Sequence, residues 1–207
     1  MSISAAKQSA QEKRYTYSDY ATWPDYPRYE LIEGEAIKME APSQIHQEIL
    51  VELGRQFANF LRKKRCKVFL APFDVRLNYK TLDNTVVQPD LLVICDMDKL
   101  NGKHCLGAPD MVAEILSPST ARKDQFIKFR LYKQAGVKEF WIIDPTRRVV
   151  TVHIMENGTQ TTEYHSDAET ISVHVLPGCE INLADVFEEA PPLEPEKEFP
   201  PELLHDV

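Results

Sequence analysis

Two carboxylates stand within apolar runs of the sequence, at places where a strand normally carries a core residue. Asp90 directly precedes the apolar run Leu91–Ile94, and Glu114 is the one charged residue between Met111 and Leu116. A buried carboxylate without a partner is costly, so both acids need a neutralising group. Two carboxylates with a backbone carbonyl and waters suit an octahedral oxygen site for Mg²⁺ or Mn²⁺.

Each acid also has a simpler interpretation. Asp90 follows Pro89, and an aspartate there can be a turn or bulge residue that accepts hydrogen bonds from backbone donors. Glu114 can be a buried glutamate that is held by an arginine. The sequence leaves these alternatives open beside the metal site.

A lysine follows the two acids on a helical pattern. The spacing predicts a helix from Ala121 to Gln134, and Lys128 falls on its apolar face. An ammonium group there can pair with a carboxylate, orient a water or stabilise the charge on a phosphate. A lysine that covers the core and reaches water with its tip would show the same pattern.

Two further residues are candidates for the edge of such a pocket. His46 lies on the apolar face of a helix expected after the N-cap Ser43, where a satisfied core histidine is the common alternative. Glu30 lies in the predicted hairpin Tyr29–Met39, where it and Glu33 flank a turn and are expected to be solvated. Both are retained as second-tier pocket residues.

The remaining pattern supplies the elements that must position these groups. Further strands are expected at Lys67–Ala71, Phe73–Leu77, Val86–Cys95, Asp110–Leu116, Lys138–Ile143 and Ser172–Leu176, with a second hairpin from Val149–Met155 and Thr161–His165. The predicted class is α/β, with a mixed β-sheet flanked by helices and extra β-hairpins.

Composition restricts the function classes. The chain has 207 residues and a net charge of −8, which argues against a broad basic surface for nucleic acid. No phosphate-binding glycine loop, nucleophile elbow or H-E-x-x-H motif occurs. Residues 1–14 are expected to be flexible, 15–189 to form one domain, and the Pro/Glu-rich residues 190–207 to be disordered.

The cellular setting is predicted from the cysteines and from hydropathy. The four cysteines form no C-x-x-C pair, and Cys66 and Cys95 are interpreted as buried thiols. No apolar run approaches the ~20 residues of a membrane span, and no signal peptide is evident. We therefore expect a cytoplasmic protein without a membrane partner.

Several motifs together resemble those of the Uma-type endonuclease family, which belongs with the PD-(D/E)XK restriction-endonuclease-like superfamily. The resemblance covers roughly 15–155, and its motifs are Tyr29–Glu35, Ala71–Leu77, Gln88–Asp90, Ala108–Thr120, Lys128–Tyr132 and Ala135–Pro145. It implies the restriction-endonuclease core, with Pro89-Asp90 as the PD element and Glu114 as the second acid. The usual lysine would stand at position 116, where this chain has Leu116. In related families the lysine migrates to the following helix, and Lys128 matches that position.

The resulting hypothesis is a Mg²⁺- or Mn²⁺-dependent endonuclease that hydrolyses phosphodiester bonds in DNA. Asp90 and Glu114 would bind the metal and Lys128 would assist catalysis, with His46 and Glu30 nearby. The alternative is a catalytically inactive module that keeps the nuclease fold and binds DNA or protein. A small-molecule hydrolase or a purely structural dimer has no motif in its favour. The late hairpins are compatible with a homodimer, and the sequence leaves the oligomeric state, strand number and sequence specificity open.

Overall fold

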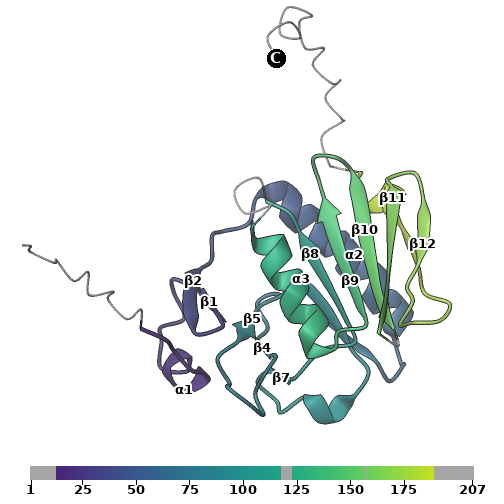
Figure 1. The fold of residues 1–207 in the computed structure, drawn as a ribbon. Coiled ribbons are helices and arrows are strands. Elements are labelled where there is room, and N and C mark those ends of the chain that lie inside the picture. The colour runs from purple at the N-terminus through teal and green to yellow at the C-terminus, as the bar shows by residue number, and fades with distance from the viewer. Residues whose placement is uncertain (1–12, 118–122, 157, 189–207) are drawn as a thin grey trace, which may run out of the picture.

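A six-stranded mixed sheet forms the centre of the molecule (Figure 1). The computed structural model describes residues 13–117, 123–156 and 158–188. The strand order in this sheet is β11-β10-β9-β8-β6-β3. The strands are β3 (Lys67–Leu70), β6 (Leu91–Ile94), β8 (Met111–Ile115), β9 (Glu139–Asp144), β10 (Val149–Glu156) and β11 (Thr159–Ser166). Strands β8 and β9 are parallel, and the other neighbours are antiparallel.

A second sheet of short strands lies beside it, with the order β2-β1-β5-β4-β7. Its strands are β1 (Tyr29–Ile32), β2 (Glu35–Lys38), β4 (Val75–Arg76), β5 (Val86–Val87) and β7 (Cys105–Leu106). Strands β12 (Thr170–Ser172) and β13 (Glu180–Asn182) form a separate pair. These sheets confirm the expected mixed α/β class with extra hairpins.

Two helices cover opposite faces of the central sheet (Figure 1). Helix α2 (Gln44–Leu61) begins at the predicted N-cap Ser43, whose side chain accepts a hydrogen bond from the backbone N–H of His46. Helix α3 (Lys123–Ala135) ends before Gly136, whose positive φ of 93° fits a helix C-terminus. The short elements are α1 (Tyr17–Tyr20), η1 (Met97–Lys99) and α4 (Leu183–Val186). Among the described residues, none of the helices is long and apolar enough to cross a bilayer.

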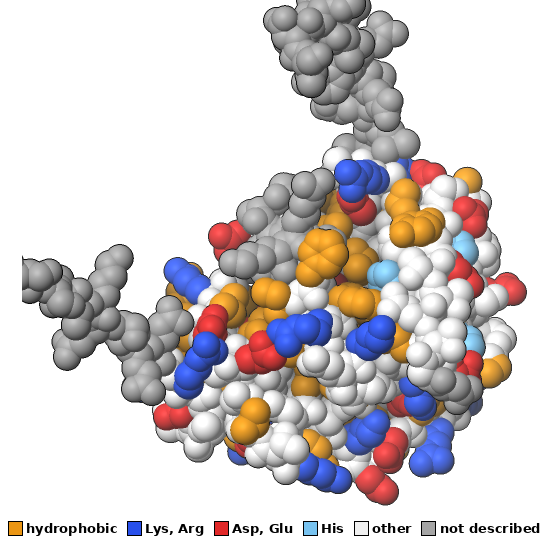
Figure 2. Space-filling model, viewed as in Figure 1, with side chains coloured by type: hydrophobic (Ala, Val, Ile, Leu, Met, Phe, Trp, Pro, Cys, Tyr) orange, Lys and Arg blue, Asp and Glu red, His pale blue; other side chains and the backbone are white. Residues whose placement is uncertain are grey.

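The outer surface on the α3 side carries mixed charge. Figure 2 shows Lys and Arg side chains interspersed with Asp, Glu and apolar side chains on this face. One such pair joins Arg130 of α3 to Glu33 in the β1–β2 turn, with Nη2–Oε2 at 2.7 Å. This mixture of charges is consistent with the net charge of −8, because the described basic side chains on this face form no broad positive surface.

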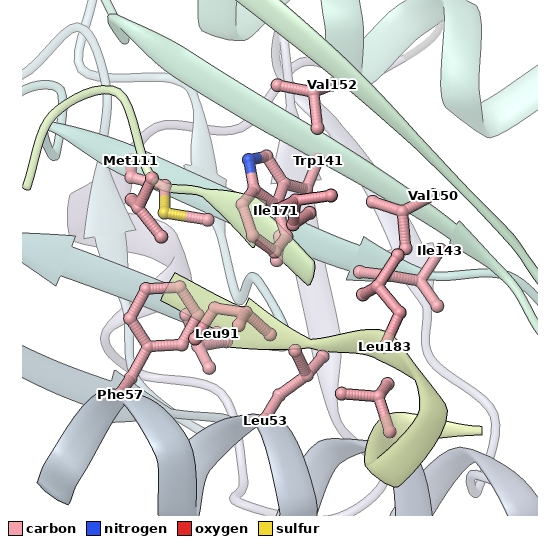
Figure 3. Packing of buried hydrophobic residues seen from close by; sticks show 14 of the residues in the cluster. Leu53, Phe57, Leu91, Met111, Trp141, Ile143, Val150, Val152, Ile171 and Leu183 are labelled. Atoms are coloured by element: carbon pink, nitrogen blue, oxygen red, sulfur yellow. The ribbon is translucent and has the colours of Figure 1, made fainter. Parts of the chain in front are cut away.

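Alternate residues of the central strands face the two helices. Leu91 and Met111 pack in the cluster that contains Leu53 and Phe57 of α2 and Trp141 of β9 (Figure 3). Their neighbours in sequence, such as Leu92 and Val112, pack instead with Leu131 and Tyr132 of α3. By the same alternation, Glu114 occupies a position on the α3 side of β8 that would otherwise carry a core residue.

Three expectations from the sequence are wrong. The run Val86–Cys95 is two strands rather than one, because the chain leaves the five-stranded sheet at Val87 and enters the central sheet at Leu91. The strand expected at Ser172–Leu176 ends at Ser172, because β12 spans Thr170–Ser172. The strand expected at Phe73–Leu77 is regular only at Val75–Arg76, after the cis peptide bond that precedes Pro72.

The cysteine expectation is also wrong for one pair. Cys66 and Cys95 form a disulfide, with their Cα atoms 4.0 Å apart. Strands β3 and β6 pair Lys67 with Ile94. Because the strands are antiparallel, this register places Cys66, just before Lys67, opposite Cys95, just after Ile94. Cys105 and Cys179 are free and buried. Of the terminal segments, residues 1–12 and the whole of 190–207 lie outside the described residues, as do residues 121 and 122 at the start of the helix predicted from Ala121.

Candidate active site

Asp90 lies where the hydrogen-bond ladder between β6 and β8 ends. Its backbone carbonyl accepts a hydrogen bond from Ala71 N at 2.9 Å. Its side-chain Oδ2 accepts one from the backbone N–H of Ile115 at 2.8 Å. The carboxylate therefore continues the ladder beyond the last regular pair, Leu91 with Ala113, and this fixes it beside the end of β8. The backbone donor expected for a turn aspartate is thus present.

Glu114 points toward α3 and meets two donors from that helix. Tyr132 Oη donates to Glu114 Oε1 at 2.6 Å, and Lys128 Nζ lies 3.1 Å from the same oxygen. The two donors are four residues apart on α3, so they share one face of the helix. Burial raises the pKa of Glu114 to about 7; Lys128 opposes this rise, and Asp90 and Glu30 add to it. The structure therefore gives Glu114 a tyrosine and a lysine as partners, instead of the arginine considered from the sequence.

Lys128 lies between two acids rather than reaching for water. Its Nζ is 3.0 Å from Glu30 Oε1 and 3.1 Å from Glu114 Oε1, and its side chain is 14% exposed. Burial alone would lower the pKa of Lys128, but Glu114 and Glu30 outweigh burial and hold it above its usual range. The ammonium is therefore charged whenever the acids are ionised, and the snorkelling alternative does not describe this side chain.

Glu30 is buried, which corrects the expectation of a solvated turn residue. It is 4% exposed, and its Oε1 accepts a hydrogen bond from the backbone N–H of Gln88 at 2.8 Å. The second-tier placement of Glu30 in the pocket agrees with this position. Glu33 behaves as a surface residue, because it is 46% exposed and pairs with Arg130.

His46 approaches Asp90 from the first turn of α2. Its Nε2 lies 3.1 Å from Asp90 Oδ2, and its side chain is 9% exposed. Its Nδ1 is buried and has no hydrogen-bond partner among the described residues. A proton on Nε2 lets this ring donate a hydrogen bond to the carboxylate. The structure thus brings together all five residues that were singled out from the sequence.

Two neighbours of these residues were not identified from the sequence as part of the group. Tyr132 was noted only as the end of the motif Lys128–Tyr132, although its spacing of four from Lys128 indicated a shared helix face. Gln88 was noted only as part of a motif, yet its backbone supports Glu30 and its Nε2 donates to Asp74 Oδ1 at 2.8 Å. For Tyr132 a signal was available in the sequence, because a tyrosine on a buried helix face needs a hydrogen-bond partner for its hydroxyl group.

The donor set fits a hard divalent cation. No described residue donates a hydrogen bond to Asp90 Oδ1 or to Glu114 Oε2, and the two side chains are 16% and 14% exposed. In the described ranges no cluster of three or more His, Cys, Asp or Glu residues could enclose an ion. Mg²⁺ is commonly held by one or two carboxylates, with waters and substrate phosphate completing the shell. A site of two carboxylates is therefore compatible with Mg²⁺ or Mn²⁺.

Comparison with known proteins gives a family and a fold. The family model described as "Uma2: Putative restriction endonuclease" matches residues 17–184. Two uncharacterized proteins of Synechocystis sp. are similar: slr1290 is 30% identical over 126 residues, and sll1609 is 28% identical over 118 residues. These matches cover 60% and 56% of this chain and 65% of each relative, which is less than two thirds of the relatives' length.

A solved structure supports the architecture. The crystal structure of a putative nuclease belonging to DUF820 from Anabaena variabilis aligns with a TM-score of 0.70 and 21% sequence identity. The alignment covers 84% of this chain and 98% of that chain. The likeness confirms the mixed α/β fold that was expected from the sequence.

Proposed function

We propose, because this chain belongs to the Uma2 family, whose model is described as "Putative restriction endonuclease", that it hydrolyses phosphodiester bonds in DNA with the help of a divalent metal ion. Asp90 and Glu114 would hold the ion, and Lys128 would act on the phosphate that is being cleaved. We further propose that the nuclease domain spans residues 15–189, which the match over 17–184 supports. A homodimer would serve cleavage of both strands, and sedimentation velocity would test for it.

One observation carries the proposal. The usual motif places a lysine two residues after the second acid, and this chain has Leu116 there. Lys128 on α3 nevertheless reaches Glu114, with Nζ and Oε1 3.1 Å apart. Residues 114 and 116 lie on the same side of an extended strand, so a lysine that comes from the helix above that side can take over the missing group's position. This position of the ammonium supports a role for Lys128 in the proposed reaction.

The balance of charge favours a cation in this pocket. Glu30 and Glu114 contact Lys128, and the charge of Asp90 acts on Glu114, so the three acids exceed the one lysine in charge once all are ionised. That excess lies in a partly desolvated place, where it attracts a metal ion strongly. It would also repel a DNA phosphate. Binding of the cation therefore prepares the site for an anionic substrate.

Each residue of the site would have a separate role in the reaction. A bound divalent ion supplies Lewis-acid stabilisation of the phosphate's negative charge. Asp90 and Glu114 each keep one oxygen available for that ion, while Ile115 N–H and Tyr132 Oη hold the opposite oxygens. Lys128 would donate to the charge that develops on the phosphate oxygens in the transition state. The fixed orientation of these groups lowers the reorganisation that the reaction requires.

A nuclease assay tests the proposal. Purified protein is incubated with supercoiled and linear DNA in Mg²⁺, in Mn²⁺ and in EDTA, and products are separated by gel electrophoresis. We expect cleavage with metal and none in EDTA. The variants Glu114→Ala and Lys128→Ala should lose cleavage, whereas Glu33→Gln, on the exposed Arg130 ion pair, should retain it.

Two results would overturn this proposal. Cleavage that survives in both Glu114→Ala and Lys128→Ala proteins, purified in parallel with a mock preparation, would show that the activity does not come from this site. Absence of cleavage by the native protein, together with absence of Mn²⁺ binding, would favour the alternative of an inactive module that keeps the nuclease fold.

A further inference from the structure

Two ion pairs join the β1–β2 hairpin to α3, and they differ sharply in environment. Glu30 pairs with Lys128 at 3.0 Å, and both side chains are nearly buried, at 6% and 14% exposed. Glu33 pairs with Arg130 at 2.7 Å, and both side chains are 46% exposed. The surface pair is of the kind that contributes little to stability, so it needs no function. The buried pair is costly to form and needs an explanation.

The position of Glu30 is fixed by the same segment that carries Asp90. Its Oε1 accepts a hydrogen bond from the backbone N–H of Gln88 at 2.8 Å, and Gln88 stands two residues before Asp90. A backbone donor is held by the chain itself, so the distance between the Glu30 carboxylate and the Asp90 segment is set by the fold. Lys128 therefore contacts a group that is fixed relative to the candidate metal ligand.

A lysine on α3 needs such a contact more than a lysine on β8 would. Its side chain is a flexible stem of four carbons, and fixing its end costs conformational entropy. Glu114, which also accepts a hydrogen bond from Tyr132, provides one contact of the ammonium, and Glu30 provides another. Without Glu30 the ammonium would be held by Glu114 alone, the same carboxylate that is proposed to serve the metal ion.

Glu30 also adds a burden that packing does not require. Its carboxylate and that of Glu114 contact the same ammonium, so two like charges lie close together in a largely buried place. An apolar residue or glutamine in β1 would avoid this cost. A second buried acid beside the first is typical of a site where stability is given up for function.

We propose that Glu30 is a positioning residue that keeps Lys128 at the phosphate side of the pocket while Asp90 and Glu114 serve the metal ion. This inference rests on the proposed nuclease function and deepens it. The hairpin β1–β2 becomes a working part of the site, because it supplies the second contact of a lysine that has moved from strand to helix.

The test compares Glu30→Gln with the matched control Glu33→Gln. Glutamine keeps the size of the side chain and the acceptor for Gln88 N–H but removes the charge that holds Lys128. We expect Glu30→Gln to lower kcat by about 10- to 100-fold, as loss of a supporting contact typically does, with KM within about twofold. Glu33→Gln should match the native protein in both constants.

A second measurement does not depend on activity. Pulsed acetylation of the metal-free protein, followed by mass spectrometry of the peptide that contains Lys128, reports how tightly this amine is held. We expect faster acetylation of Lys128 in Glu30→Gln and an unchanged rate in Glu33→Gln. If Glu30→Gln does not fold, as judged by circular dichroism, Glu30→Asp retracts the carboxylate by one carbon and should give an intermediate rate of acetylation.

A double variant separates positioning from a structural effect. If Glu30 acts through Lys128, Glu30→Gln should cause no further loss in the residual cleavage rate of a Lys128→Met protein, measured with enzyme in excess over DNA. Equal losses in both backgrounds, or a native acetylation rate in Glu30→Gln, would overturn the inference. Lack of metal-dependent cleavage by the native protein would instead overturn the proposed function, and acetylation would still decide whether Glu30 holds Lys128.

Discussion

Replacing Glu114 by glutamine should stabilise the metal-free protein at alkaline pH while it abolishes DNA cleavage. Burial raises the pKa of Glu114 from its ordinary 4.5 to about 7, with Lys128 opposing the rise and Asp90 and Glu30 adding to it. Below pH 4.5 the protonated side chain is tolerated without cost. Between pH 4.5 and 7 the folded state binds more protons than the unfolded state, so the free energy of unfolding falls as pH rises.

The size of this effect follows from the shift. A rise of the Glu114 pKa from 4.5 to about 7 corresponds to about 3 kcal/mol of the free energy of unfolding. This stability is lost in full once the pH exceeds the pKa of the folded state. Glutamine does not titrate, and its amide oxygen can still accept from Tyr132 Oη. The stability of Glu114→Gln relative to the native protein should therefore increase by about 2 to 3 kcal/mol between pH 5 and pH 8.

Urea unfolding followed by circular dichroism, in EDTA at pH 5 and pH 8, measures this difference. Glu33→Gln is the control; its carboxylate is 46% exposed, and surface substitutions usually change stability by less than about 0.5 kcal/mol. A Glu114→Gln protein that differs from the native one by the same amount at both pH values would refute the reasoning. So would a variant that is less stable than the native protein at pH 8.

Three further predictions concern the neighbours of this site and the disulfide. Reduction of Cys66–Cys95, which closes a loop with a sequence separation of 29, should lower the free energy of unfolding by about 3 to 4 kcal/mol. The Cys66→Ser/Cys95→Ser variant should match the reduced protein in urea unfolding, and a loss below about 1 kcal/mol would contradict the disulfide's role. Lys128→Met leaves Glu30 and Glu114 without a cation and should destabilise the protein by about 3 to 5 kcal/mol at pH 8. The same measurement at pH 5 should give a smaller loss, and an equal loss would argue against unpaired acids as the cause. His46→Ala removes the contact of Nε2 with Asp90 Oδ2 and should weaken Mn²⁺ binding by about 10- to 100-fold in calorimetry. Unchanged Mn²⁺ binding would make His46 a core residue only.

The central acids and the lysine could be predicted because their signals are local. Glu114 interrupts an apolar strand, and alternation along β8 places it on the side of α3. Lys128 shares a helix face with Leu131 and Tyr132, which the helical period already indicated. The resemblance of motifs then predicted the fold, which the alignment with a solved structure confirms.

The features that were missed depend on contacts between distant segments. Glu30 has the local pattern of an exposed turn, yet it is buried, and its ion-pair partner Lys128 comes from a different part of the chain. The change from one sheet to the other near Pro89 could not be predicted, because odd- and even-numbered positions from Val86 to Cys95 are both largely apolar. Such a run has the pattern of one continuous buried strand. Similarly, the spacing of Cys66 and Cys95 gave no hint of a disulfide, since the register of β3 and β6 determines it.

Calorimetric titration of the metal-free protein with Mn²⁺ shows whether Asp90 and Glu114 bind a metal ion, because no DNA is present. We predict saturable binding to the native protein and to Glu33→Gln, and affinity at least about tenfold lower in Asp90→Asn and Glu114→Gln. Absence of binding to the native protein, or equal affinity in all four proteins, would contradict a metal site formed by these two acids. The cluster would then be a structural ion pair between Lys128 and its two acids.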